Sequence, residues 1–184
     1  MHATKVAALL LASNPKPPPQ AAPPSAHGFY AWWCRDECLD RADPLIPKEP
    51  RPPVSPMWSL LYVGISPNGP TSARNIAIRF AKDHTGGTIG GSTFRQSIAS
   101  LLLASLALEP RRGSDRSRLV SEAPLANWIE ESCGVTFAPV ERPWLLEKEV
   151  IGLLNPPLNI DNGTHPFRWN VKDQRAALRH ACGL

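Results

Sequence analysis

Two short apolar runs in the hydrophobic pattern have the composition of strands. Residues 28–33 (GFYAWW) and residues 60–65 (LLYVGI) are rich in aromatic, β-branched and other apolar side chains, which favour extended backbone. Residues 34–58 between them contain many prolines and charged residues, which mark an irregular insertion. We therefore expect the two strands to pair around this insertion, and a third, shorter strand is expected at residues 135–140.

Helical spacing of apolar residues begins beyond the second strand. Ser72 is a candidate N-cap for a helix that runs to about His84, because apolar residues recur there at three- and four-residue spacing. The glycine-rich residues 86–91 predict a flexible loop. Ser92 or Thr93 can cap the helix that follows, in which apolar residues again form an inward stripe.

Three more helices are expected in the second half of the chain. The first covers about residues 124–132, and the second is opened by Pro143 at its first position and ended by the proline pair at 156–157. The third covers about residues 171–180, with Asn170 as its cap. Together with the strands, this order of elements predicts a small α+β domain.

The N-terminal segment has a different character. Proline is so frequent between residues 15 and 24 that neither a helix nor a sheet ladder is expected to persist there, so residues 1–27 are predicted to be a disordered or polyproline-like tail. The folded domain is then expected at residues 28–184. Residues 6–12 are apolar but too short for a membrane span, and they lack the clear cleavage pattern of a signal peptide.

Charge and cysteine content add only mild constraints. Lysine and arginine number 20 against 16 acidic residues, and the pI is about 9.1. This mildly favours a polyanionic partner, although a merely soluble basic protein fits equally well. Four scattered cysteines do not form a disulfide framework and contain no C-x-x-C pair, which favours reduced thiols in the cytoplasm. Metal binding by Cys34 and Cys38 is disfavoured but left open.

One carboxylate stands out by its position on a helix. At about 100° per residue, Glu147 lies between Leu154 and Ile151, inside the apolar arc of the helix that begins at Pro143, whereas Glu149 faces solvent. An inward carboxylate must be paired, protonated or bound to a metal, because an isolated buried charge is costly. Both a salt bridge to a buried arginine and a metal ligand remain open at this point.

An ordered set of motifs resembles the GIY-YIG nucleases. The two tripeptides that name this family are matched by Gly28-Phe29-Tyr30 and Tyr62-Val63-Gly64, and the family also has an arginine-bearing helix and a later helix with a metal-binding glutamate. In the repair-nuclease branch, the stretch from glutamate to asparagine is similar in residue type and spacing to Leu145-Leu146-Glu147, Ile151, Pro156 and Asn159. The resemblance covers about residues 28–159 and implies a three-stranded antiparallel sheet flanked by helices.

The resemblance also implies an activity, a metal-dependent endonuclease acting on DNA. Glu147 would bind Mg²⁺ or Mn²⁺, and Arg79 would stabilise the charge that develops on the phosphate. Tyr62, with His84 as a candidate assistant, would take a proton from the attacking water. Tyr30 would orient the nucleophile or the phosphate. Asn159 would brace the site, although it can equally satisfy turn backbone after the prolines.

Two departures from the family pattern affect these assignments. Tyr30 and Tyr62 are 32 residues apart, whereas the family tripeptides usually lie close together, so the proline-rich stretch must be an insertion. The loop between Tyr62 and the arginine is also longer than usual. Both Arg74 and Arg79 lie on the expected helix, and Arg79 is favoured because the residues up to His84 resemble the family pattern.

Several further residues are candidates for contacts with DNA. Cations that can track a phosphate backbone are Arg74, Arg95, Arg111 and Arg112, with Arg116 and Arg118 close by. The same arginines can equally form a basic face that only contacts solvent. The glycine-rich loop lacks the lysine of a Walker A motif, but its N–H groups can hold a phosphate. The alternative function is a catalytically silent nucleic-acid-binding module that retains the same fold.

Overall fold

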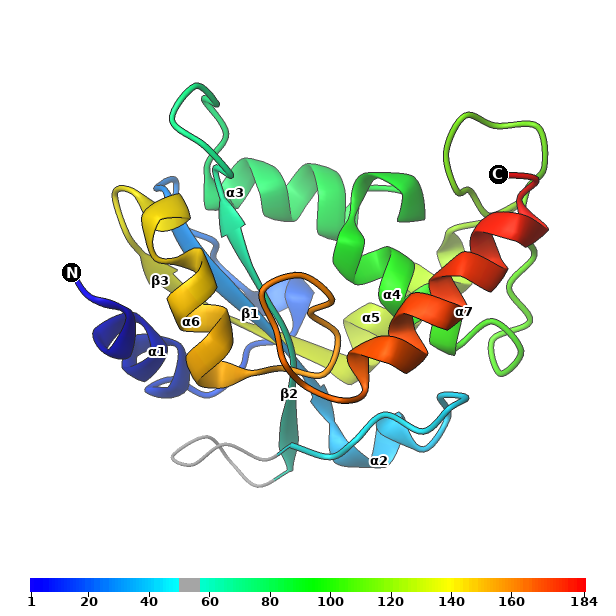
Figure 1. The fold of residues 1–184 in the computed structure, drawn as a ribbon, viewed down its shortest axis with the longest axis horizontal. Coiled ribbons are helices and arrows are strands. Elements are labelled where there is room, and N and C mark those ends of the chain that lie inside the picture. Colours follow the sequence, from blue (N-terminus) through cyan, green and yellow to red (C-terminus); the bar gives the residue numbers. More distant parts are fainter. Residues whose placement is uncertain (50–56) are drawn as a thin grey trace.

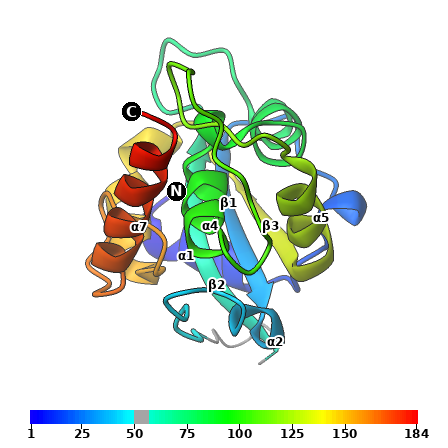
Figure 2. The same ribbon diagram turned by 90° about the vertical axis from the view of Figure 1, so that its right-hand side faces the viewer.

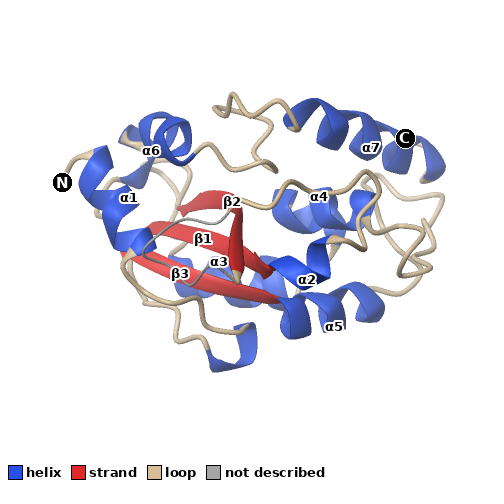
Figure 3. Cartoon of the chain, turned by 90° about the horizontal axis from the view of Figure 1, so that it is seen from below, coloured by secondary structure: helices blue, strands red, loops and turns tan. Residues whose placement is uncertain are grey.

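A computed structural model describes residues 1–49 and 57–184 of the chain. Its centre is a three-stranded antiparallel sheet in the order β2-β1-β3, formed by β1 (Gly28–Arg35), β2 (Trp58–Ser66) and β3 (Cys133–Pro139). Figure 3 shows the three strands between layers of helices. The α+β class and the small antiparallel sheet are therefore confirmed. Residues 50–56 of the expected insertion lie outside the described residues.

Strand β1 is central because its side chains can be buried on both faces of the sheet. Residues 28–34 are all buried, as their nearly continuous apolar sequence favours. One face contributes Tyr30 and Trp32 to the larger core, and the other contributes Phe29, Ala31 and Trp33 to the smaller core. Both faces must therefore be covered by other elements.

Different helices cover the two faces (Figures 1 and 2). Helices α1 (Ala3–Leu11) and α6 (Glu147–Leu154) pack against each other over the smaller core. Helices α4 (Thr93–Leu101), α5 (Ala123–Ser132) and α7 (Arg168–Ala181) contribute to the larger core. The remaining short elements are α2 (Asp36–Leu39), α3 (Ile76–Arg79), a π-helical turn (Phe80–Thr85) and 3-10 turns at Pro18–Gln20, Ile89–Gly91 and Pro143–Leu145.

The N-terminal segment is ordered, contrary to the expectation of a disordered tail. Val6 and Leu10 of α1 are fully buried in the smaller core. Lys16 then exchanges two backbone hydrogen bonds with Val135 of β3, at 3.1 and 2.9 Å. The prolines prevent a long helix but permit an extended segment, and the apolar run before them supplies a helix that covers the sheet. Among the described residues, no helix is both long and apolar enough to span a bilayer.

Several helix boundaries differ from those expected. Asn75, not Ser72, caps α3, since its side-chain oxygen accepts a hydrogen bond from the backbone N–H of Ile78. Ser92 caps α4 as expected. Pro143 opens a 3-10 turn rather than the α-helix itself, so that α6 begins at Glu147. The last helix begins at Arg168, which places the expected cap inside it.

Candidate active site

The first tyrosine of the motif lies across a glycine of the neighbouring strand. Tyr30 in β1 is paired with Gly64 in β2. A Cβ atom built on Gly64 would lie only 2.4 Å from the Tyr30 hydroxyl oxygen, closer than unbonded atoms can approach. Glycine at position 64 is therefore the residue that leaves space for the tyrosine ring. The pKa of Tyr30 is raised by burial, so its hydroxyl stays protonated.

The second tyrosine lies next to a bulge in the sheet edge. Trp32 pairs with Tyr62 and Trp33 with Leu60, which leaves Leu61 as an extra residue in β2. Bulges of this kind re-aim neighbouring side chains. The carbonyl of Leu61 accepts a hydrogen bond from the backbone N–H of Leu158 at 3.0 Å. The bulge therefore fixes the direction of Tyr62 and joins this edge to the segment after α6.

Asn159 acts as a short substitute for a fourth strand. Its side-chain oxygen accepts from the backbone N–H of Val63 at 2.9 Å, and its amide nitrogen donates to the carbonyl of Val63 at 2.8 Å. The side chain is buried. Tyr62 therefore lies between two attachment points, at Leu61 and Val63.

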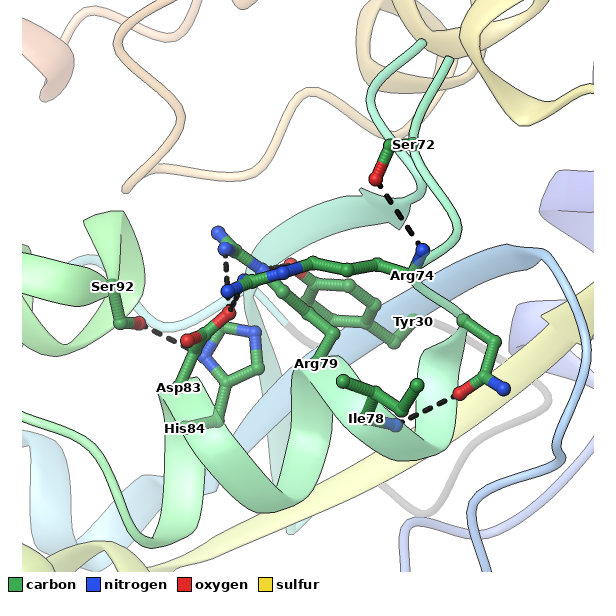
Figure 4. A network of polar contacts seen from close by, with 9 residues as sticks. Tyr30, Ser72, Arg74, Ile78, Arg79, Asp83, His84 and Ser92 are labelled. Carbon is green, nitrogen blue, oxygen red and sulfur yellow. Dashed lines mark hydrogen bonds and ion pairs between the residues drawn. The ribbon is translucent and has the colours of Figure 1, made fainter. Parts of the chain in front are cut away.

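The two candidate arginines meet at one carboxylate (Figure 4). Asp83 accepts from Arg74 at 2.5 Å and from Arg79 at 2.8 Å. Arg79 also directs its Nε toward the Tyr30 hydroxyl at 3.5 Å. Burial lowers the pKa of Arg79, but Tyr30 and Asp83 more than offset it, so the guanidinium is permanently charged. Arg79 lies beside both tyrosines, whereas Arg74 is half exposed on the outer side.

Glu147 occupies the first position of α6, with its carboxylate half buried. Glu149 is exposed, as helical geometry predicts. Within the described part of the chain, the Glu147 carboxylate has no hydrogen bond and no ion pair. The salt bridge to a buried arginine that the sequence left open is therefore absent there. Burial and the nearby Asp161 raise its pKa. A half-buried carboxylate without a partner can accept a cation.

These side chains line one cleft of about 210 Å³. Its walls come from β1, β2, α3, the start of α4, α6 and the segment after it. The lining residues are Tyr30, Tyr62, Ile65, Asn68, Arg79, Thr93, Glu147, Ile151, Asn159, Ile160, Asp161 and Asn162. The cleft combines the Arg79 guanidinium, two phenols, two carboxylates and several side-chain amides. This combination suits a phosphate bound together with a hard metal ion.

The donor set fits Mg²⁺ or Mn²⁺ better than zinc. Besides Glu147, the cleft contains the Asp161 carboxylate and side-chain amides, whose oxygens hard divalent ions prefer. In the described residues no cluster of three histidine, cysteine or acidic side chains is present. A single carboxylate with water molecules is still a usual way of binding Mg²⁺, which keeps much of its hydration shell.

His84 lies behind the cleft rather than in it. Its ring is buried, packs edge-on against Tyr30 with the ring centroids 4.9 Å apart, and forms a 2.9 Å hydrogen bond with Ser92. Burial, Arg79 and Arg95 hold its pKa well below the ordinary value for histidine. The structure therefore corrects the expected role: His84 supports Tyr30 and does not reach water in the cleft.

The expected DNA-binding arginines fall into three different environments. Arg95 is only 1% exposed; it donates to the carbonyl of His84 and pairs with Glu122 at 2.9 Å, so the expected contact with DNA is corrected to a structural role. Arg111 and Arg112 are exposed, but they lie in the segment bridged by Pro110 and Leu119, outside the residues that line the cleft. Only Arg74 is adjacent to the cleft.

Two residues near the cleft were not expected from the sequence. Asp161 lies two residues beyond Asn159, and Arg175 of α7 is close enough to Tyr62 and Asp161 for their charges to interact. The sequence offered one usable signal, the regular spacing of basic residues in α7. Cys34 is paired in register with Cys133 rather than placed next to Cys38, and both paired thiols are buried.

A comparison with protein families decides the affiliation. A family model described as the GIY-YIG catalytic domain matches residues 28–181. The chain belongs to the GIY-YIG family. The matched range includes α7, beyond the last residue on which the sequence resemblance rested. No curated protein and no solved structure gave a significant match. GIY-YIG proteins are a nuclease family that acts on DNA, and its members generally use divalent metal ions.

Proposed function

We propose that this GIY-YIG protein is a metal-dependent endonuclease that hydrolyses phosphodiester bonds of DNA. One observation carries the proposal: Tyr30, Tyr62, Arg79 and Glu147 come from four separate elements and line the same cleft. These are the residues that the family motifs single out. Their joint placement supports an intact catalytic site. A catalytically silent binding module would not need all four of these side chains in one cleft.

The positive charge of Arg79 is suited to the phosphate that is cut. Its guanidinium is held by Asp83 on one side and directed toward the cleft beside Tyr30. A planar, permanently charged group fixed before the substrate arrives stabilises the charge that develops on the phosphoryl oxygens. Asp83 and Tyr30 therefore position the group that stabilises the transition state.

The phenol of Tyr62 is suited to handling the attacking water. Burial raises its pKa, while the nearby Arg79 lowers it. The phenol is therefore neutral in the free protein, and it orients water as a hydrogen-bond acceptor. It can take a proton from water only after it has lost its own, and the additional positive charge of a loaded site would favour that loss by lowering its pKa. The attachments at Leu61 and Val63 keep this oxygen in place during the reaction.

Glu147 would hold the metal ion, and further oxygen ligands in the same cleft are available from Asp161 and from the side-chain amides of Asn68 and Asn162. A divalent ion bound there would neutralise charge on the phosphate and on the leaving 3′ oxygen. The carboxylate is already partly removed from water and has no partner to give up among the described residues. Binding a cation therefore does not require an existing ion pair to be broken.

Plasmid nicking tests the proposal. Wild-type protein is expected to nick supercoiled DNA only when Mg²⁺ or Mn²⁺ is present. Glu147→Gln and Arg79→Ala are each expected to lower the rate by at least about 10³-fold, as the loss of a metal ligand or a transition-state cation does. Glu149→Gln, two residues away and exposed, is the matched control and should cut normally.

Two results would count against the proposal. Unchanged nicking by Glu147→Gln would remove the metal-binding role of this residue. A wild-type protein that binds DNA but never cuts it, with either metal, would favour the catalytically silent module. Circular dichroism of each variant distinguishes a lost function from a lost fold.

A further inference from the structure

Basic residues recur along one edge of helix α7. Arg168, Lys172, Arg175 and Arg179 are separated by four, three and four positions. At about 100° per residue, all four lie within an arc of roughly 60° on the helix surface. We refer to these four residues as the α7 basic stripe. The single acidic residue of the helix, Asp173, lies roughly 100° beyond the nearer edge of this arc.

The α7 basic stripe has no ion pairs among the described residues, although Arg175 lies close enough to Asp161 for their charges to interact. Lys172 and Arg179 are exposed, and the other two are partly buried. Arg168 donates a hydrogen bond to the carbonyl of Gly163, and Arg175 donates to the side-chain carbonyl of Gln96; both acceptors are neutral. Within residues 1–49 and 57–184, none of the four cations is ion-paired with a carboxylate.

The α7 basic stripe leads away from the cleft. Helix α4 begins at Thr93, which lines the cleft, and Gln96 one turn later binds Arg175 of α7. Figures 1 and 2 show α7 lying alongside α4, with the segment that carries Asn159 and Asp161 leading into it. The middle of the stripe therefore lies next to the cleft wall, and Lys172 and Arg179 extend the positive charge to either side.

We propose that the α7 basic stripe binds the phosphate backbone of duplex DNA beside the phosphate that is cut. The eleven residue steps from Arg168 to Arg179 rise about 16 Å along the helix, which corresponds to the rise of about five base pairs. Contacts of this kind fix the position of DNA without reading its sequence. The proposal rests on the proposed function, because it assigns the surface along which the substrate of that cleft would lie.

The test measures DNA binding directly. Binding of a fluorescein-labelled 20-base-pair duplex is followed by anisotropy in EDTA, between 50 and 300 mM salt, for wild type and for Lys172→Ala/Arg179→Ala. Each lost phosphate contact reduces the slope of log K against log salt by about 0.9. The double variant is therefore expected to lose about 1.8 from the slope and on the order of 30-fold in affinity at 0.15 M salt.

The matched control removes the same charge elsewhere. Lys5 and Lys16 are exposed and belong to the N-terminal segment that covers the other face of the sheet. Lys5→Ala/Lys16→Ala should change the affinity by less than about threefold. Both double variants remove only exposed side chains, so their melting temperatures should match that of the wild type.

Each outcome separates this proposal from the proposed function. If wild type nicks plasmid but Lys172→Ala/Arg179→Ala keeps its affinity and salt slope, the α7 proposal is overturned and the nuclease stands. If wild type binds DNA in an α7-dependent way but never nicks it, the stripe stands and the nuclease is overturned. If wild type does not bind the duplex at all, the α7 proposal is overturned, and the nicking assay alone decides the activity.

Discussion

Two polar regions flank Tyr30, and they differ in how their charges are satisfied. In the cleft, Arg79 is held by Asp83 but Glu147 has no partner among the described residues. Behind the tyrosine, Arg95 is enclosed by Glu122 and a backbone carbonyl. Arg95 Nε and His84 Nε2 also have no hydrogen-bond partner in the described part of the chain, but they are enclosed in the interior, whereas the Glu147 carboxylate lies in a cleft that a ligand can enter. The comparison assigns function to the cleft and structure to the interior.

The largest effect that separates the two regions is expected at Glu122. Glu122→Gln should lower the free energy of unfolding by about 3 kcal/mol, because it leaves the buried Arg95 charge without its carboxylate. Nicking by the folded protein should be unchanged. Urea unfolding measures the loss, and Glu130→Gln, exposed on the helix α5 that follows Glu122, should unfold like the wild type. A stable but inactive Glu122→Gln would place the interior region in the catalytic machinery instead.

Gly64 offers a smaller effect on the group that divides the two regions. The methyl group of Gly64→Ala would collide with the Tyr30 ring, so the ring or strand β2 must move. We expect nicking to fall on the order of 100-fold, since displacement of about 1 Å in a site has that effect, and stability to fall by about 1–3 kcal/mol.

A control for Gly64→Ala is available on helix α6. Gly152 is exposed, and a Cβ atom added there would meet no other atom within 4 Å. Alanine is also the better helix former by about 0.5–1 kcal/mol. Gly152→Ala should therefore stabilise the protein and leave nicking intact. Full activity in Gly64→Ala would show that the position of the Tyr30 ring does not matter for the reaction.

The sequence predicted those features that depend on local pattern. The strands around Tyr30 and Tyr62 follow from runs of apolar residues, and the inward position of Glu147 follows from helical spacing. The four residues of the α7 basic stripe also follow from spacing once the helix is known. The α+β class was confirmed for the same reason, because the order of local elements restricts how they can pack.

Features that depend on distant partners could not be predicted in this way. Arg95 carries the same charge as Arg111, and only the fold places it beside Glu122 in the interior. Asp83 binds both candidate arginines, and only the fold shows that Arg79 also faces the Tyr30 hydroxyl and lines the cleft. The prolines at residues 15–24 dominate the composition of the N-terminal segment and obscure the apolar residues of α1, although a short helix needs only a surface to cover.

The smallest effect is a dependence of stability on pH through His84. Its pKa in the folded protein is held well below the ordinary value by burial and by the neighbouring Arg79 and Arg95. In the unfolded chain a histidine side chain has a pKa near 6.5. Below about pH 6.5 the unfolded state therefore binds a proton that the folded state does not, and stability is lost as pH falls. The free energy of unfolding should therefore decline more steeply, by up to about 1.4 kcal/mol per pH unit.

Urea unfolding between pH 7 and 5 tests this dependence. Glutamine at position 84 cannot titrate, so the free energy of unfolding of His84→Gln should decline less steeply than that of the wild type. The control His180→Gln, exposed at the end of α7, should follow the wild type. An unchanged slope in His84→Gln would mean that this ring is protonated as easily in the interior as in water.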